Sequence, residues 1–585
     1  MSLLLFLAAV HAADAAPAVS VSTDLGFSGW VVPDVWLPLR VEVRSSIALS
    51  GVVDVEVPNG PAAGAAVYRR ALLISPGSRL RFTIPVVIQD PRRPLILTVR
   101  DAHGEAVLRQ DIVIGRDRVV EGVVIALSSD PAGLEFLAGY PRRLRGAYVG
   151  EAMLPDHWAA YAGVDLVVLR DADERSLSGV QRRALRQWVA QGGRLLVTGG
   201  ILQQRQAWLA DLLPAVVSPA PVMASAERLL PGMPAPLPVA VLRPKPGAEA
   251  RPAGGLPLVV SRPYGRGLVM AWAFDAFAPS VRSWPGRLAL WDQILTGRPA
   301  RPVAQQDLID VIPTARTLSG AAQVQIVALA VLYILAIRLV LRRAAGRAAV
   351  LVALATVVAV FTILLYAASS TARRSAAATV QLSVVESTGA GDLAAVKTYL
   401  AVLLPYGGSY RVTTPDGSLL RPMAPLAVLS TAANAVEGEA APSVLLFEAV
   451  QTIAFPVHGQ AVASGEGLEL DVDNGSGLTM TAPSVYLNGQ TQALPEIAAH
   501  LAVPLPPQQW ERADRNTASG NFEHDARVRL AARLDAYMTP AIIGYKTLWL
   551  IGAIRDPRLS AHLDGAGEQQ GLSLVLSPID VTGGR

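Results

Sequence analysis

Three acidic residues, Asp171, Asp173 and Glu174, follow an apolar stretch at residues 164–169 that is interrupted only by Asp165. Such a stretch predicts a strand buried on both faces. Ligands of open α/β sheets bind beyond the carboxyl ends of the strands, and carboxylate oxygens suit hard cations. The three acids could therefore hold a cation or a polar ligand, although a solvated loop has the same composition and is the interpretation we favour.

A second acidic group, Asp471, Asp473 and Asn474, superficially suggests a calcium loop. An EF-hand loop needs an acid or amide at its fifth position, where this chain has Gly475. Two alternating apolar–polar runs flank the Asn-Gly pair within residues 468–481. Asn-Gly between such runs is a strong hairpin signal, so we predict a hairpin and no metal.

The remaining chemistry-bearing residues form no complete set. The chain has no cysteine, which excludes thiolate metal sites and a cysteine nucleophile. It also lacks a GxSxG elbow and an HExxH pattern. We expect His157 to be a packing or surface residue, and the basic, glycine-rich residues 262–267 to form a hairpin turn. No catalytic residue, metal or cofactor is predicted. The seven histidines are scattered: His11, His103, His157, His458, His500, His524 and His562.

The composition indicates that part of the chain lies outside water. Hydrophobic residues make up 51% of the 585 residues, and charged residues only 17%, against about 25% in ordinary soluble domains. The length suggests three or four domains at roughly 150 residues each. The net charge of +4 is small, and no basic stripe with interleaved aromatics appears, so nucleic-acid binding is not predicted.

Two apolar segments, residues 322–341 and 349–368, are each long enough to cross a bilayer as a helix. A pair of buried core helices is the alternative. Basic residues near short loops mark the cytoplasmic side, so the tip of this hairpin is expected inside and both large flanking regions outside. Four arginines lie at the tip: Arg338, Arg342, Arg343 and Arg347.

The N-terminus, residues 1–16, combines a short apolar run with small residues and an A-x-A-type sequence. This pattern predicts a secretory signal peptide. A buried strand or an N-terminal anchor is the alternative. A signal peptide would direct the following region out of the cytoplasm, which agrees with the orientation expected from the arginines.

Residues 17–116 predict a β-sandwich, because short alternating runs recur between Pro/Gly turns. Residues 375–585 predict a β-rich extracytoplasmic domain. Within it, residues 548–554 are apolar but too short for a span, so they are interpreted as a core strand that pairs with residues 572–576. The alternating runs of the sandwich are residues 40–44, 53–57, 80–84 and 95–99.

Residues 117–300 predict an α/β domain built on an open parallel sheet. Continuous apolar runs at 123–127 and 164–169 predict buried strands. Ser178 and Gln181 have capping-box spacing at the start of a helix, and the glycine pair after it precedes another strand at 194–198. A strand, a helix and a strand in this order are typical of a parallel sheet.

Three stretches of this region carry a family resemblance: LPDHWAAYAGVDLVVLRDAD, LSGVQRRALRQWVAQGGRLLVTGG and GRGLVMAWAFD. They resemble the class I glutamine amidotransferase-like domain. More narrowly, the chain is similar to bacterial membrane-anchored proteins of unknown function that place this domain after a β-sandwich. The resemblance implies a fold, but true amidotransferases use a cysteine nucleophile with a His and a Glu. The absence of cysteine therefore argues against glutaminase chemistry here.

The expected protein is multidomain: an N-terminal β-sandwich, an amidotransferase-like α/β domain, two transmembrane helices and a C-terminal β-rich domain. We expect a non-catalytic binding or scaffold protein of the bacterial cell envelope, anchored in the cytoplasmic membrane with its large domains facing the periplasm or cell surface. Its expected partners are the membrane and a protein of the envelope. The alternatives are an accessory subunit of a membrane transport complex and an enzyme that uses acids of the α/β domain.

Overall fold

The computed structural model describes most of the chain, in these ranges: residues 18–58, 65–170, 177–199, 209–224, 232, 236–253, 256–296, 306–312, 320–343, 346–373, 377–387, 392–405, 407–423, 427–430, 434–441, 443–464, 467–514, 521–537, 547–564 and 568–582.

The N-terminal sandwich, strands β1–β7, consists of two sheets whose inner side chains share one hydrophobic core. One sheet contains β1 (Val19–Leu25), β2 (Trp36–Ser45) and β5 (Ser78–Val87). The other contains β3 (Leu49–Pro58), β4 (Ala65–Ile74), β6 (Leu95–Asp101) and β7 (Ala106–Ile112). The four predicted alternating runs all lie in strands, and most of their apolar side chains lie in this core.

The second sheet of the sandwich continues into the C-terminal part of the chain. Strand β4 pairs in parallel with β21 (Ala427–Ser430), and three more strands extend the sheet to eight. Nothing in the local sequence predicts this pairing, because its two partners are far apart along the chain. The three further strands are β22 (Ala435–Ala440), β19 (Gly408–Thr413) and β31 (His562–Leu563).

The parallel-sheet region, strands β8–β16, has the strand order β14-β15-β16-β11-β10-β8-β9, with β12 and β13 as a separate pair. The five strands from β16 to β9 are parallel, and β14 and β15 add an antiparallel edge. The strands are β8 (Gly122–Leu127), β9 (Leu144–Tyr148), β10 (Val164–Leu169), β11 (Arg194–Val197), β12 (Ala215–Ala224), β13 (Leu237–Pro244), β14 (Glu249–Ala253), β15 (Leu256–Tyr264) and β16 (Gly267–Trp272).

Helix α1 (Gly179–Ala190) joins β10 to β11 and begins as the sequence predicts. The Ser178 hydroxyl accepts a hydrogen bond from the Gln181 amide at 3.2 Å, and the Gln181 side chain accepts one from the Ser178 amide at 2.9 Å. This reciprocal capping box satisfies backbone donors that the first turn cannot pair. Two short helices, α2 (Pro279–Ser283) and α3 (Arg287–Leu295), follow β16.

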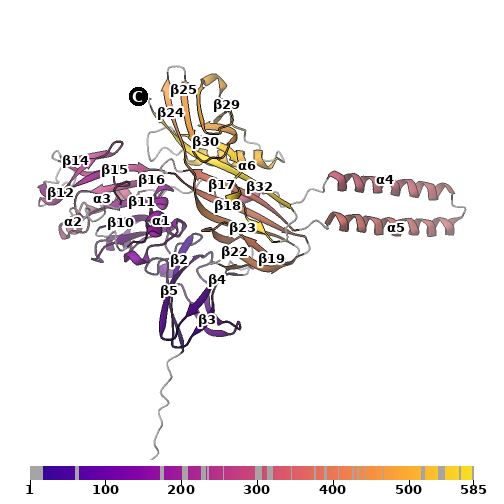
Figure 1. The fold of residues 1–585 in the computed structure, drawn as a ribbon, viewed down its shortest axis with the longest axis horizontal. Helices are drawn as coiled ribbons and strands as arrows, with labels where there is room; N and C mark the ends of the chain where they lie inside the picture. Colours follow the sequence, from indigo (N-terminus) through magenta and orange to yellow (C-terminus); the bar gives the residue numbers. More distant parts are fainter. Residues whose placement is uncertain are drawn as a thin grey trace, which may run out of the picture.

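Helices α4 (Gly320–Arg343) and α5 (Arg347–Arg373) project from the body as a long hairpin (Figure 1). Tyr333 and Phe361 touch between them, with ring centroids 5.2 Å apart. One window, Ala348–Leu365, is apolar and long enough to span a membrane, with a mean hydropathy of 2.8. None of the described side chains in either helix is buried, so core packing does not explain their apolar character.

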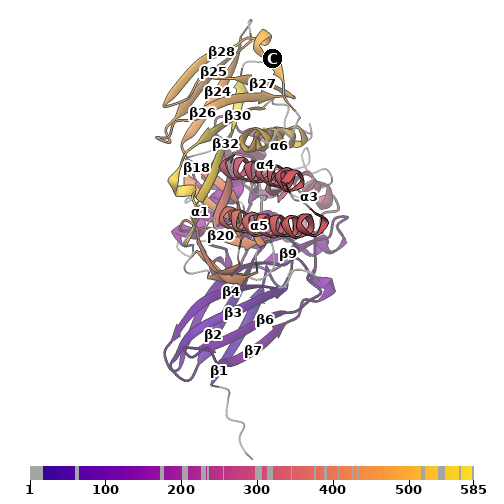
Figure 2. The same cartoon turned by 90° about the vertical axis from the view of Figure 1, so that its right-hand side faces the viewer.

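The C-terminal region, strands β17–β32, is built around a twelve-stranded sheet, and helix α6 (Phe522–Tyr537) packs on this sheet through Ala526, Leu530 and Leu534. Figure 2 shows the α4–α5 hairpin between the N-terminal sandwich and strands β24–β28. The strands of the sheet are β17 (Ala378–Ser387), β18 (Leu393–Leu404), β20 (Leu419–Pro422), β23 (Ser443–Ala454), β24 (Val457–Ser464), β25 (Gly467–Asn474), β26 (Thr481–Leu487), β27 (Gln490–Ala493), β28 (His500–Leu505), β29 (Glu511–Arg512), β30 (Thr547–Ile554) and β32 (Glu568–Thr582).

Of the two pairings predicted in this region, one is confirmed and one is wrong. Strand β30 pairs with β32, with Ile551 opposite Leu576, as expected. The predicted hairpin around Asn474 and Gly475 does not form: β25 pairs with β24 and β28, and β26 pairs with β27 and β30.

The Asn474 side chain explains the wrong prediction. Its amide nitrogen donates to the carbonyls of Leu478 and Ile497, at 2.8 and 3.0 Å, and its oxygen accepts from the Ser476 amide at 3.2 Å. Asn favours such local hydrogen bonds to nearby backbone. They hold an irregular turn that sends the chain away from β25 rather than back along it.

Candidate functional site

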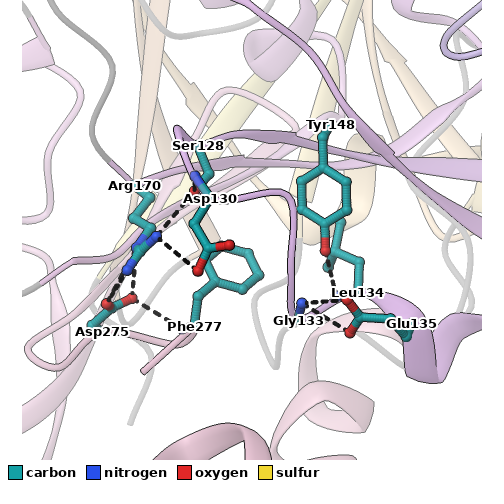
Figure 3. Close-up of polar contacts among 9 residues, drawn as sticks. All are labelled: Ser128, Asp130, Gly133, Leu134, Glu135, Tyr148, Arg170, Asp275 and Phe277. Carbon is teal, nitrogen blue, oxygen red and sulfur yellow. Dashed lines mark hydrogen bonds and ion pairs between the residues drawn. The ribbon is translucent and has the colours of Figure 1, made fainter. Parts of the chain in front are cut away.

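The carboxyl edge of the parallel sheet is where the sequence places a possible site. Asp171, Asp173 and Glu174 lie outside the described residues. The residue before them, Arg170, is at the centre of a polar cluster formed by the ends of β8, β10 and β16 (Figure 3). Its guanidinium binds Asp275 through two nitrogens, at 2.8 and 3.1 Å, a bidentate geometry that is among the strongest ionic hydrogen bonds.

The other polar groups of this cluster are also engaged in hydrogen bonds or ion pairs. Arg170 also donates to the Ser128 hydroxyl at 3.2 Å and lies 3.9 Å from an Asp130 oxygen. The Phe277 amide donates to Asp275 at 2.9 Å. These contacts tie three strand ends together. The described residues of the edge therefore form a structural clamp rather than an exposed acid–base pair.

The neighbouring loop is closed by its own hydrogen bonds. Glu135 accepts from the Gly133 amide at 2.8 Å, and the Tyr148 hydroxyl accepts from the Leu134 amide at 2.7 Å (Figure 3). Burial raises the pKa of Tyr148 to about 12, so this hydroxyl stays protonated at neutral pH. It supports the loop as a fixed acceptor.

The histidines form no metal centre in the described part of the chain, where no group of three or more acidic or histidine side chains converges. His11 lies outside that part. His157 caps a 3₁₀ turn (Trp158–Tyr161) by accepting from the Ala159 amide at 3.1 Å. Burial lowers the pKa of His157 to about 4, although Asp156 and a hydrogen bond with the Gly417 backbone oppose this shift.

The other singled-out residues have local roles. His458, His500 and His524 lie near single carboxylates, those of Asp392, Asp471 and Asp514, at 3.2 to 3.4 Å. Asp471 and Asp473 lie in β25 opposite residues of β28. The turn at residues 262–267 joins β15 to β16 as a hairpin, as predicted, with Gly265 at a φ of 59°.

A cavity of about 460 Å³ lies where the three regions meet. The N-terminal sandwich contributes Asp34 and Trp36 to its wall. The parallel-sheet region contributes Glu121, Arg142, Trp158, Asp165, Trp188 and Gln191. The C-terminal region contributes Glu386, Lys397, Arg421 and Glu448. Small-molecule sites are commonly formed at domain interfaces and have volumes of roughly 300–1,000 Å³.

Ion pairs run through the wall of this cavity. Two pairs lie within one region each, and two connect different regions. The pairs within a region are Arg142–Asp165 at 2.8 Å and Lys397–Glu448 at 3.2 Å. The connecting pairs are Arg266–Glu386 at 2.7 Å and Arg421–Asp34 at 3.7 Å. The Asp165, Glu386 and Glu448 side chains are only 5–6% exposed.

Polar atoms in this wall without a hydrogen-bond partner among the described residues include Trp36 Nε1, Trp158 Nε1, Gln191 Oε1 and Arg421 Nε. Buried polar groups are paired in the large majority of cases. The wall therefore retains hydrogen-bonding capacity that the described protein atoms do not use.

The sequence contains only one hint of this cavity. Asp165 interrupts an otherwise apolar strand and is 4% exposed, which signals a buried charge with a nearby partner. Its partner Arg142 and the other wall residues come from distant parts of the chain. Their proximity depends on how the three regions pack, so no local pattern predicts it.

Comparisons with known proteins add a domain match and partial likenesses. A family model described as a domain of unknown function (DUF8726) matches residues 18–115, the N-terminal sandwich. No curated protein matches the chain significantly.

Two solved structures are similar to part of this chain. Exo-beta-1,4-mannosidase Op5Man5 from Opitutaceae bacterium strain TAV5 is 16% identical over 30% of this chain and 36% of that chain, with a TM-score of 0.22. The yeast delta-COP-I mu-homology domain, complexed with a Dsl1 WxWxV peptide, is 9% identical over 35% of this chain and 97% of that chain, with a TM-score of 0.21. The chain thus spans about a third of the mannosidase's length.

Proposed function

We propose that this chain is a membrane-anchored, extracytoplasmic protein of the bacterial cell envelope that binds or scaffolds without catalysis. The α4–α5 hairpin is the observation that carries the proposal. It stands clear of the body (Figure 1), and the described side chains of its two apolar helices are not buried. In water such a surface would be unfavourable, whereas hydrocarbon would solvate it.

The hairpin also accounts for the placement of the large regions. In this proposal α4 is the second span beside the apolar window of α5, and the arginine-rich tip lies in the cytoplasm. The body precedes and follows the hairpin, so all three regions then lie on the outer side. A cleaved signal peptide at residues 1–16 is part of the same proposal.

The absence of catalysis is proposed from the chemistry of the described groups. In this proposal the parallel-sheet region is a glutamine amidotransferase-like domain, supported by its strand order and by the sequence resemblance. The chain has no cysteine to act as nucleophile. At the carboxyl edge, Arg170 and Asp275 are engaged with each other, which favours a structural use of this edge.

The cysteine-free chain permits a direct test of topology. Single cysteines are placed at Ala102 in the β6–β7 turn, Gln490 in β27 and Ala348 beside the hairpin tip, all of which are exposed. We expect a membrane-impermeant maleimide to label A102C and Q490C in spheroplasts, and A348C only after permeabilisation. The unmodified chain is the matched control, because it cannot react. Labelling of A348C alone in intact spheroplasts would reject the proposal.

A further inference from the structure

We infer that the cavity between the three regions binds an uncharged, polyhydroxylated small molecule of the size of a short saccharide. This inference rests on the proposed function as a binding protein and specifies its ligand class. The cavity has the volume of a small-molecule site, and its wall comes from all three regions rather than from one fold.

The charges of the wall favour an uncharged ligand. The buried carboxylates of Asp165, Glu386 and Glu448 each have a basic partner within 3.2 Å. A fully ionised ligand would add a charge to a wall that is already paired, and desolvating that charge is costly without a new partner. A neutral ligand avoids this cost.

The same ion pairs suit hydroxyl groups. A carboxylate offers about four lone-pair sites, and a Lys ammonium has three N–H donors. The Lys397–Glu448 contact joins Nζ to one carboxylate oxygen, so it does not use every donor and acceptor of the two groups. Hydroxyls are donors and acceptors at once, so they match a wall in which both kinds of group alternate. Gln191 and Arg421 add atoms that lack a protein partner among the described residues.

Tryptophan supplies the apolar part of the wall. Trp36, Trp158 and Trp188 all line the cavity, and each is at least nine-tenths buried. Indole rings combine a large apolar surface with one N–H donor. A sugar ring has C–H faces and a rim of hydroxyls. Its faces therefore complement the apolar surface of an indole ring, and its hydroxyls complement the indole N–H.

Other ligand charges fit less well. The wall contains five carboxylates, on Asp34, Glu121, Asp165, Glu386 and Glu448, but only three basic side chains. This excess opposes an anion. An organic cation would be attracted by it, but Asp165, Glu386 and Glu448 each already have a basic partner within 3.2 Å, so these buried carboxylates offer a cation no unpaired charge. Binding of either charged class in place of a sugar is a result that would overturn the inference.

The test is a titration of the full-length protein followed by tryptophan fluorescence. The protein is purified in a polyoxyethylene detergent, because a maltoside detergent would itself present a disaccharide. The probes are maltose, cellobiose and N,N′-diacetylchitobiose, with choline and inorganic phosphate as the charged probes. We expect a saturable change with at least one disaccharide and none with choline or phosphate. No saturable change with any disaccharide would overturn the inference.

Two variants connect binding to the cavity. The double variant Lys397→Met, Glu448→Gln removes one buried ion pair while keeping side-chain size, and we expect affinity to fall by about tenfold or more. The matched control is Arg411→Met, Glu437→Gln, which removes an exposed cross-strand pair of the same region, 49% and 50% exposed. Equal affinity of the two double variants would overturn the inference.

A cavity-filling variant covers the case in which the ion-pair variant does not fold. Ala395 lines the cavity and is 6% exposed, so Ala395→Leu occupies space without changing charge. We expect it to bind the disaccharide at least tenfold more weakly, with an unchanged melting temperature. The maleimide experiment gives an independent result, because topology can be as proposed when no sugar binds. The two failures are therefore distinguishable.

Discussion

Arg170 is the residue on which the carboxyl edge of the parallel sheet depends. It is 15% exposed and binds the 22% exposed Asp275 through two nitrogens. Removing one partner of a partly buried, charge-assisted pair costs more than the pair contributes net, because the other group stays desolvated. The acids that the sequence places beside it would thus act next to a fixed cation.

We expect Arg170→Met to lower the free energy of unfolding by about 2 kcal/mol. The double variant Arg170→Met, Asp275→Asn should recover part of this loss, because no carboxylate is then left without a cation. Chemical denaturation measures both values. Arg411→Met, at an exposed pair, is the control, and a loss there of the same size would contradict the assignment.

His157 makes stability depend on pH. Its pKa is about 4 in the folded protein and about 6.5 in an unfolded chain. Above pH 6.5 both states hold the neutral ring, and stability is at its full value. As pH falls from 6.5 to 4, the unfolded state takes up a proton that the folded state does not, so stability falls.

The variant His157→Asn should weaken this dependence. Asn can still accept from the Ala159 amide as a helix cap but does not titrate. We expect the loss of stability between pH 7 and pH 4.5 to be smaller in His157→Asn than in the unmodified protein, measured by denaturation at both values. An identical loss in the two proteins would show that other groups cause it.

At the scale of elements, helix α5 is the element for which the proposal specifies a lipid environment. Val358 is 46% exposed and lies near the middle of the apolar window Ala348–Leu365. An arginine at the centre of a membrane-spanning helix costs about 3 kcal/mol on insertion scales. We therefore expect Val358→Arg to increase the fraction of protein released from membranes by alkaline carbonate. Val358→Leu is the matched control, and equal retention of the two variants would contradict a lipid environment for α5.

The elements also show which local sequence signals are sufficient to predict structure. Helix α1 begins at its predicted capping box, and β30 pairs with β32, because short-range hydrogen bonds and apolar runs determine both. The Asn-Gly signal failed because the Asn474 side chain makes four hydrogen bonds to backbone groups, among them one to the distant Ile497. The cavity could not be predicted for the same reason, since Arg266 reaches Glu386 only after the regions pack.

At the scale of the whole molecule, strand pairing joins the first and last regions. The parallel pairing of β4 with β21 places both in one eight-stranded sheet, and one continuous hydrophobic core contains residues of all three regions. We expect one calorimetric unfolding transition for the body of the full-length protein. Two well-separated transitions, one of them assigned to the sandwich by limited proteolysis, would contradict this cooperativity.

The β4–β21 pairing also has a consequence for biosynthesis. Ala66 of β4 is made long before its partner Ala427, with the two long apolar helices between them. At usual synthesis rates this interval is on the order of tens of seconds. Throughout it, β4 is an open sheet edge that can pair with another chain. Misassembly is therefore most probable during this interval, while the N-terminal sandwich is still nascent. A chaperone that shields this edge would raise the yield of the mature protein.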